Sequence, residues 1–463
     1  TTYEYNDSAS GRYENGTPKN AKLDTVTYPD GSSVEYTFEA DTGWVTQEKR
    51  PVGNGSDRYT TYAYSHAGDA TANETNLYER PRTVSELYGA TTIAKTYYAY
   101  TGAAQTEIQE CATAVAAWDA AANLVTTNTY ATDGLTNGLI LSASTPLGTS
   151  AFTYEIAGLS GSDFTALGKL TAASVHSTGQ TVTNVVNASG TREKAVTVDT
   201  DSGQTTASAV STVDAFGRLT QTTFLDGTSE SYASWTMHGP ETVTGIDGSS
   251  TTYGYYDNGR VKEIDRGDTG VLLEYEYDAL GNPTSATATG DDATSVASSA
   301  SYDAQSRPVS RTDLLGTTTY AYDNESYGVE TTITYEDGGV LTRERYHDGS
   351  VKQIYGTAAK AKRQYEYSID GGLFYAKQIR PVGGATTEWT KKTFDALGNV
   401  AEIEHSGGGG EATTLSFDAK GRFDGWEDEQ DIARVLTYTE RNEIQDAGLD
   451  FNGDGSLAAA SQD

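Results

Sequence analysis

Short runs of alternating apolar and polar residues recur along most of the chain. In residues 329–335, Val329, Ile333 and Tyr335 share one side of the alternation and polar side chains take the other. A period of two, with many β-branched and aromatic residues, is typical of a half-buried strand. Further Tyr-rich or Val-rich runs occupy 33–38, 60–64, 96–100 and 151–155. The pattern predicts an all-β protein built from many short strands.

A recurring turn phrase separates these runs. It reads aromatic or apolar residue, Asp, two residues, Gly, then Arg or Asn, most clearly at 213–218, 277–282, 394–399 and 417–422. Asp in this position accepts a backbone hydrogen bond from two residues on, and Gly supplies a positive φ. Each unit is therefore predicted to be a strand, a turn and a strand, stacked into one antiparallel sheet. The residues assigned to the turns are Asp214, Asp257, Asp278, Asp303, Asp323, Asp370, Asp395, Asp418, Gly217, Gly281, Gly398 and Gly421.

The turn phrase repeats at a regular spacing. Counting His347-Asp348-Gly349 as one copy, the aspartates stand at 257, 278, 303, 323, 348, 370, 395 and 418, so neighbours are 20 to 25 residues apart. Such a period indicates a solenoid, in which each unit buries its apolar face against its neighbours. We expect regular repeats over 201–445, degenerate repeats over 1–200 and a separate loop at 446–463. We therefore expect one continuous array, a fragment of a longer chain, instead of the three domains that the length alone suggests.

Two local features refine this picture. The tetrapeptide Arg50-Pro51-Val52-Gly53 returns as Arg380-Pro381-Val382-Gly383, which relates the degenerate half to the regular one. The Ala-rich segment 112–123 fits either a short helix or a hairpin insertion in the sheet.

The turn phrase resembles the hallmark of the RHS-repeat, or YD-repeat, family. The resemblance implies a continuous β-sheet coiled into a superhelix or hollow shell, as in bacterial polymorphic toxins, toxin-complex cocoons and teneurins. In toxin members the shell encloses an effector that is released by self-cleavage beside an Asp-Pro-x-Gly-Leu phrase. Here the nearest text, Asp446-Ala447-Gly448-Leu449, lacks the proline, so neither autoproteolysis nor a cargo is assigned.

The net charge excludes several partners. The chain has 463 residues, with 65 Asp and Glu against 32 Lys and Arg, a formal charge of −33. Nucleic acid and anionic membranes are polyanions held mainly by Lys and Arg, so neither is expected to bind. No apolar run approaches the roughly 18 residues that span a bilayer. The single cysteine, Cys111, rules out an internal disulfide framework. An extracellular or cell-surface location is expected.

The segment 450–457 has the pattern of a calcium loop. Oxygen donors at positions 1, 3 and 5, Gly at 6 and an apolar residue at 8 match the first half of an EF-hand or dockerin loop. Position 12 is Ser461 rather than the usual Glu, and the alternative is a simple Asx-Gly turn. The predicted Ca²⁺ ligands are Asp450, Asn452, Asp454 and the carbonyl of Ser456.

Tyrosine is the most unusual component, at 32 residues. Alternating tyrosines place rings on one face of successive strands, where they stack as a ladder that serves as the core. The alternative is an exposed aromatic platform for sugars that also uses Trp44, Trp118, Trp235, Trp389 and Trp426. The alternating tyrosines are Tyr253, Tyr255, Tyr275, Tyr277, Tyr320, Tyr322, Tyr365 and Tyr367.

The repeat aspartates are interpreted as turn formers rather than as a metal ladder or paired catalytic carboxylates. The arginines of the phrase are expected to pair with neighbouring acidic side chains and to keep adjacent units in register. They are Arg218, Arg260, Arg307 and Arg422.

No catalytic or phosphate-binding motif is present in the sequence. The first interpretation is therefore a non-enzymatic, exported structural protein: a shell, stalk or filament segment that joins like units end to end. The alternatives are an adhesin or carbohydrate-binding module, with surface glycans as partners, and a toxin-delivery cocoon without its effector.

Overall fold

The computed structural model contains β-strands as its only regular secondary structure over the residues it describes. These residues are 1–6, 13–14, 17–18, 22–39, 43–65, 80–102, 104–132, 137–157, 169–177, 179–186, 192–383, 386–407, 412–428, 433–439 and 442–450. Within them, no helix is long and apolar enough to cross a membrane.

Thirty-six of the strands belong to one sheet, and β2 and β3 form a separate pair. The first nineteen are β1 Thr2–Asn6, β2 Tyr13–Glu14, β3 Thr17–Pro18, β4 Lys22–Thr27, β5 Ser33–Phe38, β6 Val45–Pro51, β7 Asp57–Ala63, β8 Thr83–Tyr88, β9 Thr91–Thr101, β10 Ala104–Glu110, β11 Leu124–Tyr130, β12 Ile140–Thr145, β13 Gly148–Ala157, β14 Lys169–His176, β15 Gln180–Val186, β16 Arg192–Asp199, β17 Thr205–Val213, β18 Leu219–Phe224 and β19 Ser229–Trp235. The others are β20 Pro240–Thr244, β21 Ser250–Tyr255, β22 Val261–Arg266, β23 Val271–Tyr277, β24 Pro283–Thr289, β25 Ser295–Tyr302, β26 Pro308–Asp313, β27 Gly316–Glu325, β28 Gly328–Thr334, β29 Val340–Tyr346, β30 Val351–Tyr355, β31 Arg363–Asp370, β32 Leu373–Gly383, β33 Thr386–Phe394, β34 Val400–His405, β35 Ala412–Phe417, β36 Phe423–Glu427, β37 Ala433–Tyr438 and β38 Ile444–Asp450.

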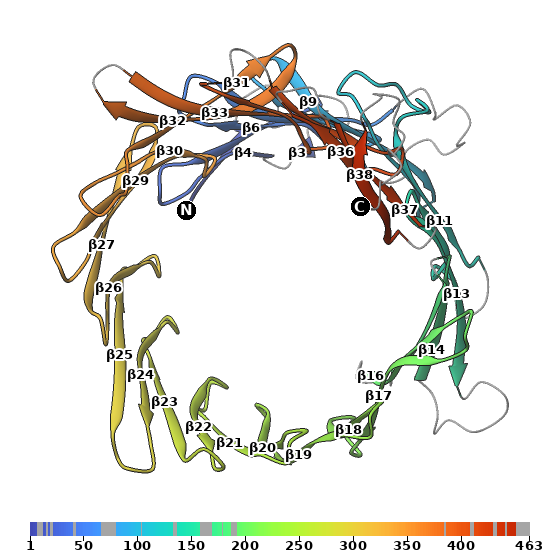
Figure 1. Ribbon diagram of the computed structural model, residues 1–463, viewed down its shortest axis with the longest axis vertical. Helices are drawn as coiled ribbons and strands as arrows, with labels where there is room; N and C mark the ends of the chain where they lie inside the picture. Colours follow the sequence, from blue (N-terminus) through green and yellow to red (C-terminus); the bar gives the residue numbers. More distant parts are fainter. Residues whose placement is uncertain are drawn as a thin grey trace, which may run out of the picture. The chain divides into compact units, whose positions relative to one another are not determined.

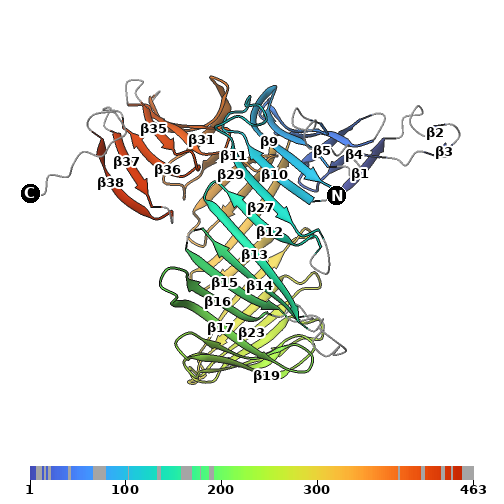
Figure 2. The same cartoon turned by 90° about the vertical axis from the view of Figure 1, so that its right-hand side faces the viewer.

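The strands follow one another in the sheet as they follow one another in the chain. Strands β23 to β26 pair antiparallel in sequence order and lie side by side in Figure 1. Strands β13 to β16 do the same in Figure 2. Short connections between antiparallel neighbours explain this order, because a hairpin needs only a few residues to reverse the chain. The predicted all-β, antiparallel hairpin array is confirmed.

The chain divides into two compact units. Unit 1 comprises 1–128, 145–147 and 321–463, and unit 2 comprises 129–144 and 148–320. These units are defined by which residues lie close together in space. The predicted boundary near residue 200 separates degenerate from regular repeats, and it stays a prediction.

Unit 1 brings the beginning and the end of the chain together. The backbone N–H of His347 donates to the carbonyl of Val52 at 3.0 Å. Arg58 pairs with Asp348, with 3.0 Å between Nε and Oδ2. The hydroxyl of Tyr88 donates to the carbonyl of Tyr367 at 3.0 Å. Degenerate repeats and regular repeats therefore pack against each other within this unit.

The segment 112–123 contains turns and neither a helix nor a strand, so the helical alternative is wrong. Buried Gln109, only 1% exposed, organises this loop. Its side-chain oxygen accepts from the backbone N–H of Asp119 at 2.8 Å and from the amide of Asn123 at 3.1 Å. The loop satisfies its polar groups through this side chain, so Ala-rich composition does not lead to a helix here.

Candidate functional site: the links between successive repeats

The repeat turn is held by its aspartate. In the turn at 214–218, one carboxylate oxygen of Asp214 accepts from the backbone N–H of Phe216 at 2.8 Å and of Arg218 at 3.0 Å. Gly217 has φ of 79° and donates its N–H to the carbonyl of Asp214 at 3.0 Å. Asp278, Asp303, Asp395 and Asp418 accept backbone N–H groups in the same way, and in the Asp303 turn Ser306, with φ of 61°, takes the place of the glycine. A register shift precedes each of these turns, as expected where a residue in the left-handed region closes a hairpin through a bulge.

A second turn type stands between these copies. In the β18–β19 turn the aspartate comes two residues later in the phrase, and Asp226 Oδ1 accepts from the N–H of Thr228 at 2.9 Å. Asp247, Asp292, Asp337 and Asp348 do the same in their own turns. Where the two types alternate, as at Asp214 and Asp226, one repeat is two strands and two different turns. In the Asp292 turn Ala293 takes the place of the glycine, and Asp337 and Asp348 form two successive turns of the second type. From the sequence we identified the first type and missed most of the second, although the pattern x-x-Asp-Gly is visible in the sequence at Asp226, Asp247 and Asp337.

Most of the assigned turn residues lie in turns. Gly281, Gly398 and Gly421 have positive φ values of 92°, 84° and 76°. Asp257 lies in the β21–β22 turn, where Asn258 accepts the capping hydrogen bond from the N–H of Arg260 instead.

Two assigned aspartates lie in strands. Asp370 is the last residue of β31, before a tight Gly371-Gly372 turn. Asp323 lies within β27, and its hairpin turns at 326–327. Ser326 stands three residues after Asp323 just as Ser306 stands three residues after Asp303, so the local sequence does not distinguish this strand position from the Asp303 turn.

The arginine of the phrase links one unit to the next through an aromatic ring. Arg218 pairs with Asp214 of its own turn at 2.7 Å, so the expected ion pair forms within a unit. Arg307 and Arg422 likewise pair with the aspartate of their own turn. The guanidinium of Arg218 also lies 5.6 Å from the ring centroid of Trp235 in the following unit. Equivalent contacts join Arg260 to Tyr277 at 5.7 Å and Arg422 to Tyr438 at 4.2 Å.

The aromatic residue completes the link with a hydrogen bond. Tyr277 donates its hydroxyl to the carbonyl of Val261, the residue that follows Arg260 in the preceding unit, at 3.0 Å. Such a bond contributes about 1 kcal/mol. Each donor reaches the first residue after the preceding turn phrase. The other pairs are Trp235 Nε1 with Leu219 O at 2.8 Å, Tyr255 with Pro240 O at 3.0 Å, Tyr367 with Val351 O at 2.9 Å, and Tyr438 with Phe423 O.

The electrostatics of these groups agree with their roles. Burial raises the pKa of Tyr367 to about 12, so its hydroxyl stays a donor at neutral pH. The side-chain and backbone hydrogen bonds from Asn282 lower the pKa of Asp278. The side-chain hydrogen bond from Arg218, followed by backbone hydrogen bonds, lowers the pKa of Asp214. The turn is therefore built around an ionised carboxylate and a neutral phenol.

The alternating tyrosines are half-buried, and so are the five tryptophans. Among the described tyrosines, Tyr3, Tyr5, Tyr28 and Tyr335 are exposed, at 57%, 55%, 42% and 39%. The hydroxyl contacts explain the tyrosine surplus more fully than ring stacking, because phenylalanine stacks equally well and cannot donate.

The structure does not describe most of the predicted calcium loop. Asp450 ends β38, and Asn452, Asp454 and Ser456 lie outside the described residues. Within the described ranges no group of three or more His, Cys, Asp or Glu side chains is arranged to hold a metal ion.

The repeat geometry defines a class: an all-β protein made of antiparallel hairpins joined by Asp-Gly turns and inter-unit aromatic links. Comparison of the sequence with models of protein families finds no match, and comparison with curated proteins finds none. Two solved structures share the fold. One, described as TcdB2-TccC3-TEV, has a TM-score of 0.58 at 12% identity and covers 95% of this chain. The other, TcdB2-TccC3-Cdc42, has a TM-score of 0.51 at 10% identity and covers 90%.

The chain spans only 22% and 25% of those two chains. At this level of identity the likeness concerns the fold alone. It supports an RHS-like shell fold, in agreement with the resemblance of the turn phrase.

Proposed function

We propose that the chain is a non-enzymatic structural segment of an exported RHS-like shell, whose task is to form a wall. The observation that carries the proposal is the inter-unit link: aromatic donors reach the preceding unit at positions from Trp235 to Tyr438, and arginine contacts accompany three of them, at Trp235, Tyr277 and Tyr438. These groups satisfy one another. Because the aromatic donors, the arginines and the turn aspartates hold neighbouring repeats together, they suit a mechanical role better than a catalytic one.

The structural similarity supports a narrower version of this role. Both neighbours are structures of TcdB2-TccC3, and the fold is shared over at least 90% of this chain. We propose a toxin-complex cocoon-like shell as the specific form of the wall. The chain would associate with further repeats or with like subunits through strand edges, since unpaired edge strands invite pairing.

Calcium binding at Asp450, Asn452, Asp454 and Ser456 belongs to the same proposal. Hard oxygen donors would hold Ca²⁺ near the end of the array and reduce repulsion in a chain of charge −33. An extracellular location would supply the necessary millimolar calcium.

Electron microscopy of the native assembly, with calcium and with a chelator, tests the proposal. We expect a particle whose wall is a continuous β-sheet and whose integrity falls on chelation. A dispersed monomer with a measurable catalytic activity would overturn the structural role. If the particles and their melting temperature are unchanged after chelation, the calcium proposal is contradicted and the shell proposal is not.

A further inference from the structure

The basic residues of this acidic chain are concentrated in one stretch. Residues 343–392 hold 10 of the 32 Lys and Arg but only 5 of the 65 Asp and Glu. Strands β29 to β33 therefore carry a local excess of positive charge. The basic residues are Arg343, Arg345, Lys352, Lys360, Lys362, Arg363, Lys377, Arg380, Lys391 and Lys392.

A cleft of about 450 Å³ lies within this basic stretch of unit 1. Its floor is set by strand register, because Gln378 of β32 stands opposite Thr390 of β33, which stands opposite His405 of β34. Arg380 is two residues beyond Gln378, and Arg363 is two residues before Tyr365, the partner of Gln378 on β31. Residues two apart in a strand share a face, so these side chains line one side of the sheet.

The cleft is positively charged. Lys360, Arg363 and Arg380 line it, and Glu388 is the one carboxylate among the described residues that do so. Glu388 pairs with Arg380. In the described part of the chain, Lys360 and Arg363 form no ion pair. Lys391 provides the contrast: it lies on the opposite face, with 2.6 Å to each of Asp370 and Glu404.

Neutral hydrogen-bonding groups complete the floor. Gln378 accepts the hydroxyl of Tyr365 through Oε1 at 3.2 Å, which directs its NH₂ group away from that contact. The hydroxyl of Thr390 lies 3.1 Å from Nδ1 of His405. A guanidinium fork suits a carboxylate, and amide and hydroxyl groups suit sugar hydroxyls.

We propose that this cleft binds a carboxylate-bearing saccharide of the uronic-acid class. The carboxylate would engage Arg363, with Arg380 and Lys360 beside it, and the ring hydroxyls would meet Gln378 and Thr390. Gln378 and Thr390 beside the cations favour an acidic sugar over nucleic acid, whose binding is dominated by contacts from Lys and Arg to phosphates. The proposed glycan partner is therefore an acidic sugar held mainly by cations. Trp389, one of the tryptophans of the predicted aromatic platform, also lines the cleft. It does not depend on the shell role.

Calorimetric titration of the full chain with a galacturonic acid trisaccharide tests the site, with the neutral galactose trisaccharide as the matched ligand. We expect binding of the acidic sugar that weakens as salt is raised, and no binding of the neutral one. Arg363→Gln should weaken binding about tenfold, as expected for loss of a charged hydrogen-bonding partner. Arg363→Lys should recover only part of the loss, because an ammonium cannot form the bidentate contact.

Two further variants protect the test against simple misfolding. Glu388→Gln should tighten binding several-fold, since it frees Arg380, and a damaged fold would not do this. Lys391→Gln, on the opposite face, should leave affinity unchanged. Equal binding of the neutral sugar, or equal loss in Arg363→Gln and Lys391→Gln, would overturn the proposal. Tighter binding of hexaglutamate than of the sugar would also overturn it and would identify an acidic protein segment as the ligand instead.

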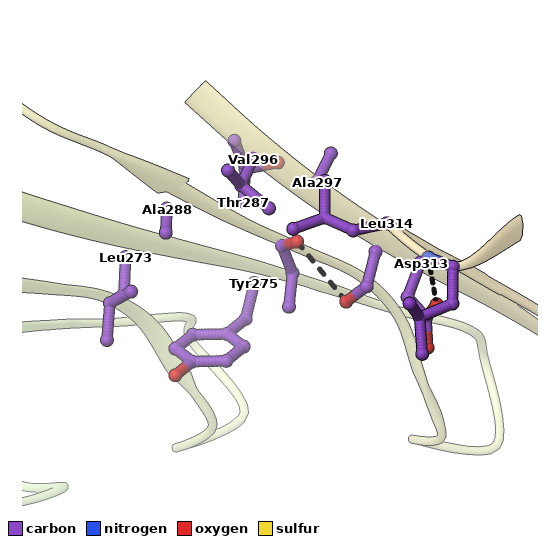
Figure 3. A pocket seen from close by; sticks show the side chains of 11 residues that line it. Leu273, Tyr275, Thr287, Ala288, Val296, Ala297, Asp313 and Leu314 are labelled. Carbon is purple, nitrogen blue, oxygen red and sulfur yellow. Dashed lines mark hydrogen bonds between the residues drawn. The ribbon is translucent and has the colours of Figure 1, made fainter. Parts of the chain in front are cut away.

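A second concave region, on the apolar face of β23 to β26 in unit 2, carries no proposal. Leu273, Ala288 and Val296 line it beside the exposed Leu314 (Figure 3). Nothing in the structure shows what covers this face.

Discussion

The two compact units use the same strand chemistry and differ in how they exclude water. Of the described residues, unit 2 buries only Ala131, Ser174 and Thr222. Unit 1 contains all the other buried side chains, including Val52 and Cys111 at 0% exposure. These are Val26, Val34, Val52, Arg82, Tyr88, Ala99, Tyr100, Gln109, Cys111, Asn123, Thr342, Glu344, Thr393 and Ala396.

The difference shows what a hairpin array requires. Unit 1 is layered, because strands from the two ends of the chain pack on each other and enclose side chains. Unit 2 consists of half-buried strands joined by turns and by aromatic donors, so we expect its stability to come from the interactions between neighbouring repeats. The packing of strands on each other in unit 1 therefore adds a buried core, but the hairpin array of unit 2 forms without one.

One repeated tetrapeptide displays this contrast directly. Val52 and Val382 occupy the same place in Arg-Pro-Val-Gly, yet Val52 is fully buried and Val382 is 49% exposed. The segment around Tyr327 and His347 covers Val52. The burial comes from a long-range contact and not from the local sequence.

The largest effect is expected where the two ends of the chain meet. Gly53 has φ of 88°, and a Cβ at this position would lie 2.5 Å from the carbonyl oxygen of Tyr327. Gly53→Ala combines backbone strain with a clash against rigid backbone, so we expect a loss of about 3 kcal/mol in unfolding free energy. Chemical denaturation followed by circular dichroism measures it.

Gly55→Ala is the matched control for that substitution. Gly55 has φ of 91° and open space around its Cβ position, so only the strain of about 1 kcal/mol should remain. If the two variants are equally stable, the close packing of unit 1 at Tyr327 does not exist.

A smaller effect is expected from the inter-unit link of unit 2. Tyr277→Phe removes the hydroxyl that donates to Val261 and keeps the ring under Arg260, so about 1 kcal/mol should be lost. The control is Tyr275→Phe in the same strand, since the hydroxyl of Tyr275 makes no hydrogen bond within the described structure. Tyr275→Phe should be close to neutral. Equal losses of unfolding free energy in the two variants would show that the Tyr277 ring packs but that its hydroxyl does not stabilise the link.

The smallest single-site effect is expected from the turn carboxylates, and it depends on pH. Hydrogen bonds from Asn282 lower the pKa of Asp278 in the folded state. Stability from this group is fully present above the unfolded pKa, near 3.9, and is lost as pH falls through the lower folded value. Wild-type melting temperature should therefore drop below about pH 4, less steeply in Asp278→Asn. Identical pH profiles would show that the turn does not need an ionised aspartate.

The repeat phrase predicted the array because Asp and Gly act locally. The turns at Asp214 and Asp278 follow from hydrogen bonds over four residues, which a short sequence window contains. The prediction for Asp323 was wrong although its local sequence resembles that of the Asp303 turn, since both aspartates have a serine three residues on. The acceptor of Tyr277 was not predictable from one unit alone, because it belongs to the preceding repeat.

The contacts within unit 1 were still less accessible to sequence reasoning. Gly53 and Tyr327 are far apart in the chain, and the repeat pattern does not specify which units meet. The basic cleft near Arg363 was missed for a related reason, since its residues gather only when the register of β31 to β34 is known. A count of charges over 343–392 would have drawn attention to it.

Hydrogen–deuterium exchange of residues 205–313 tests the central claim most directly. If links between successive repeats stabilise the sheet without a buried core, backbone amides in β21 to β25 will exchange slowly in native buffer, and Tyr277→Phe will speed exchange around β22 and β23. Exchange of 205–313 at the rate of an unfolded chain, while β8 to β10 of unit 1 remain protected, would contradict the claim and show that the array is stable only where a second layer covers it.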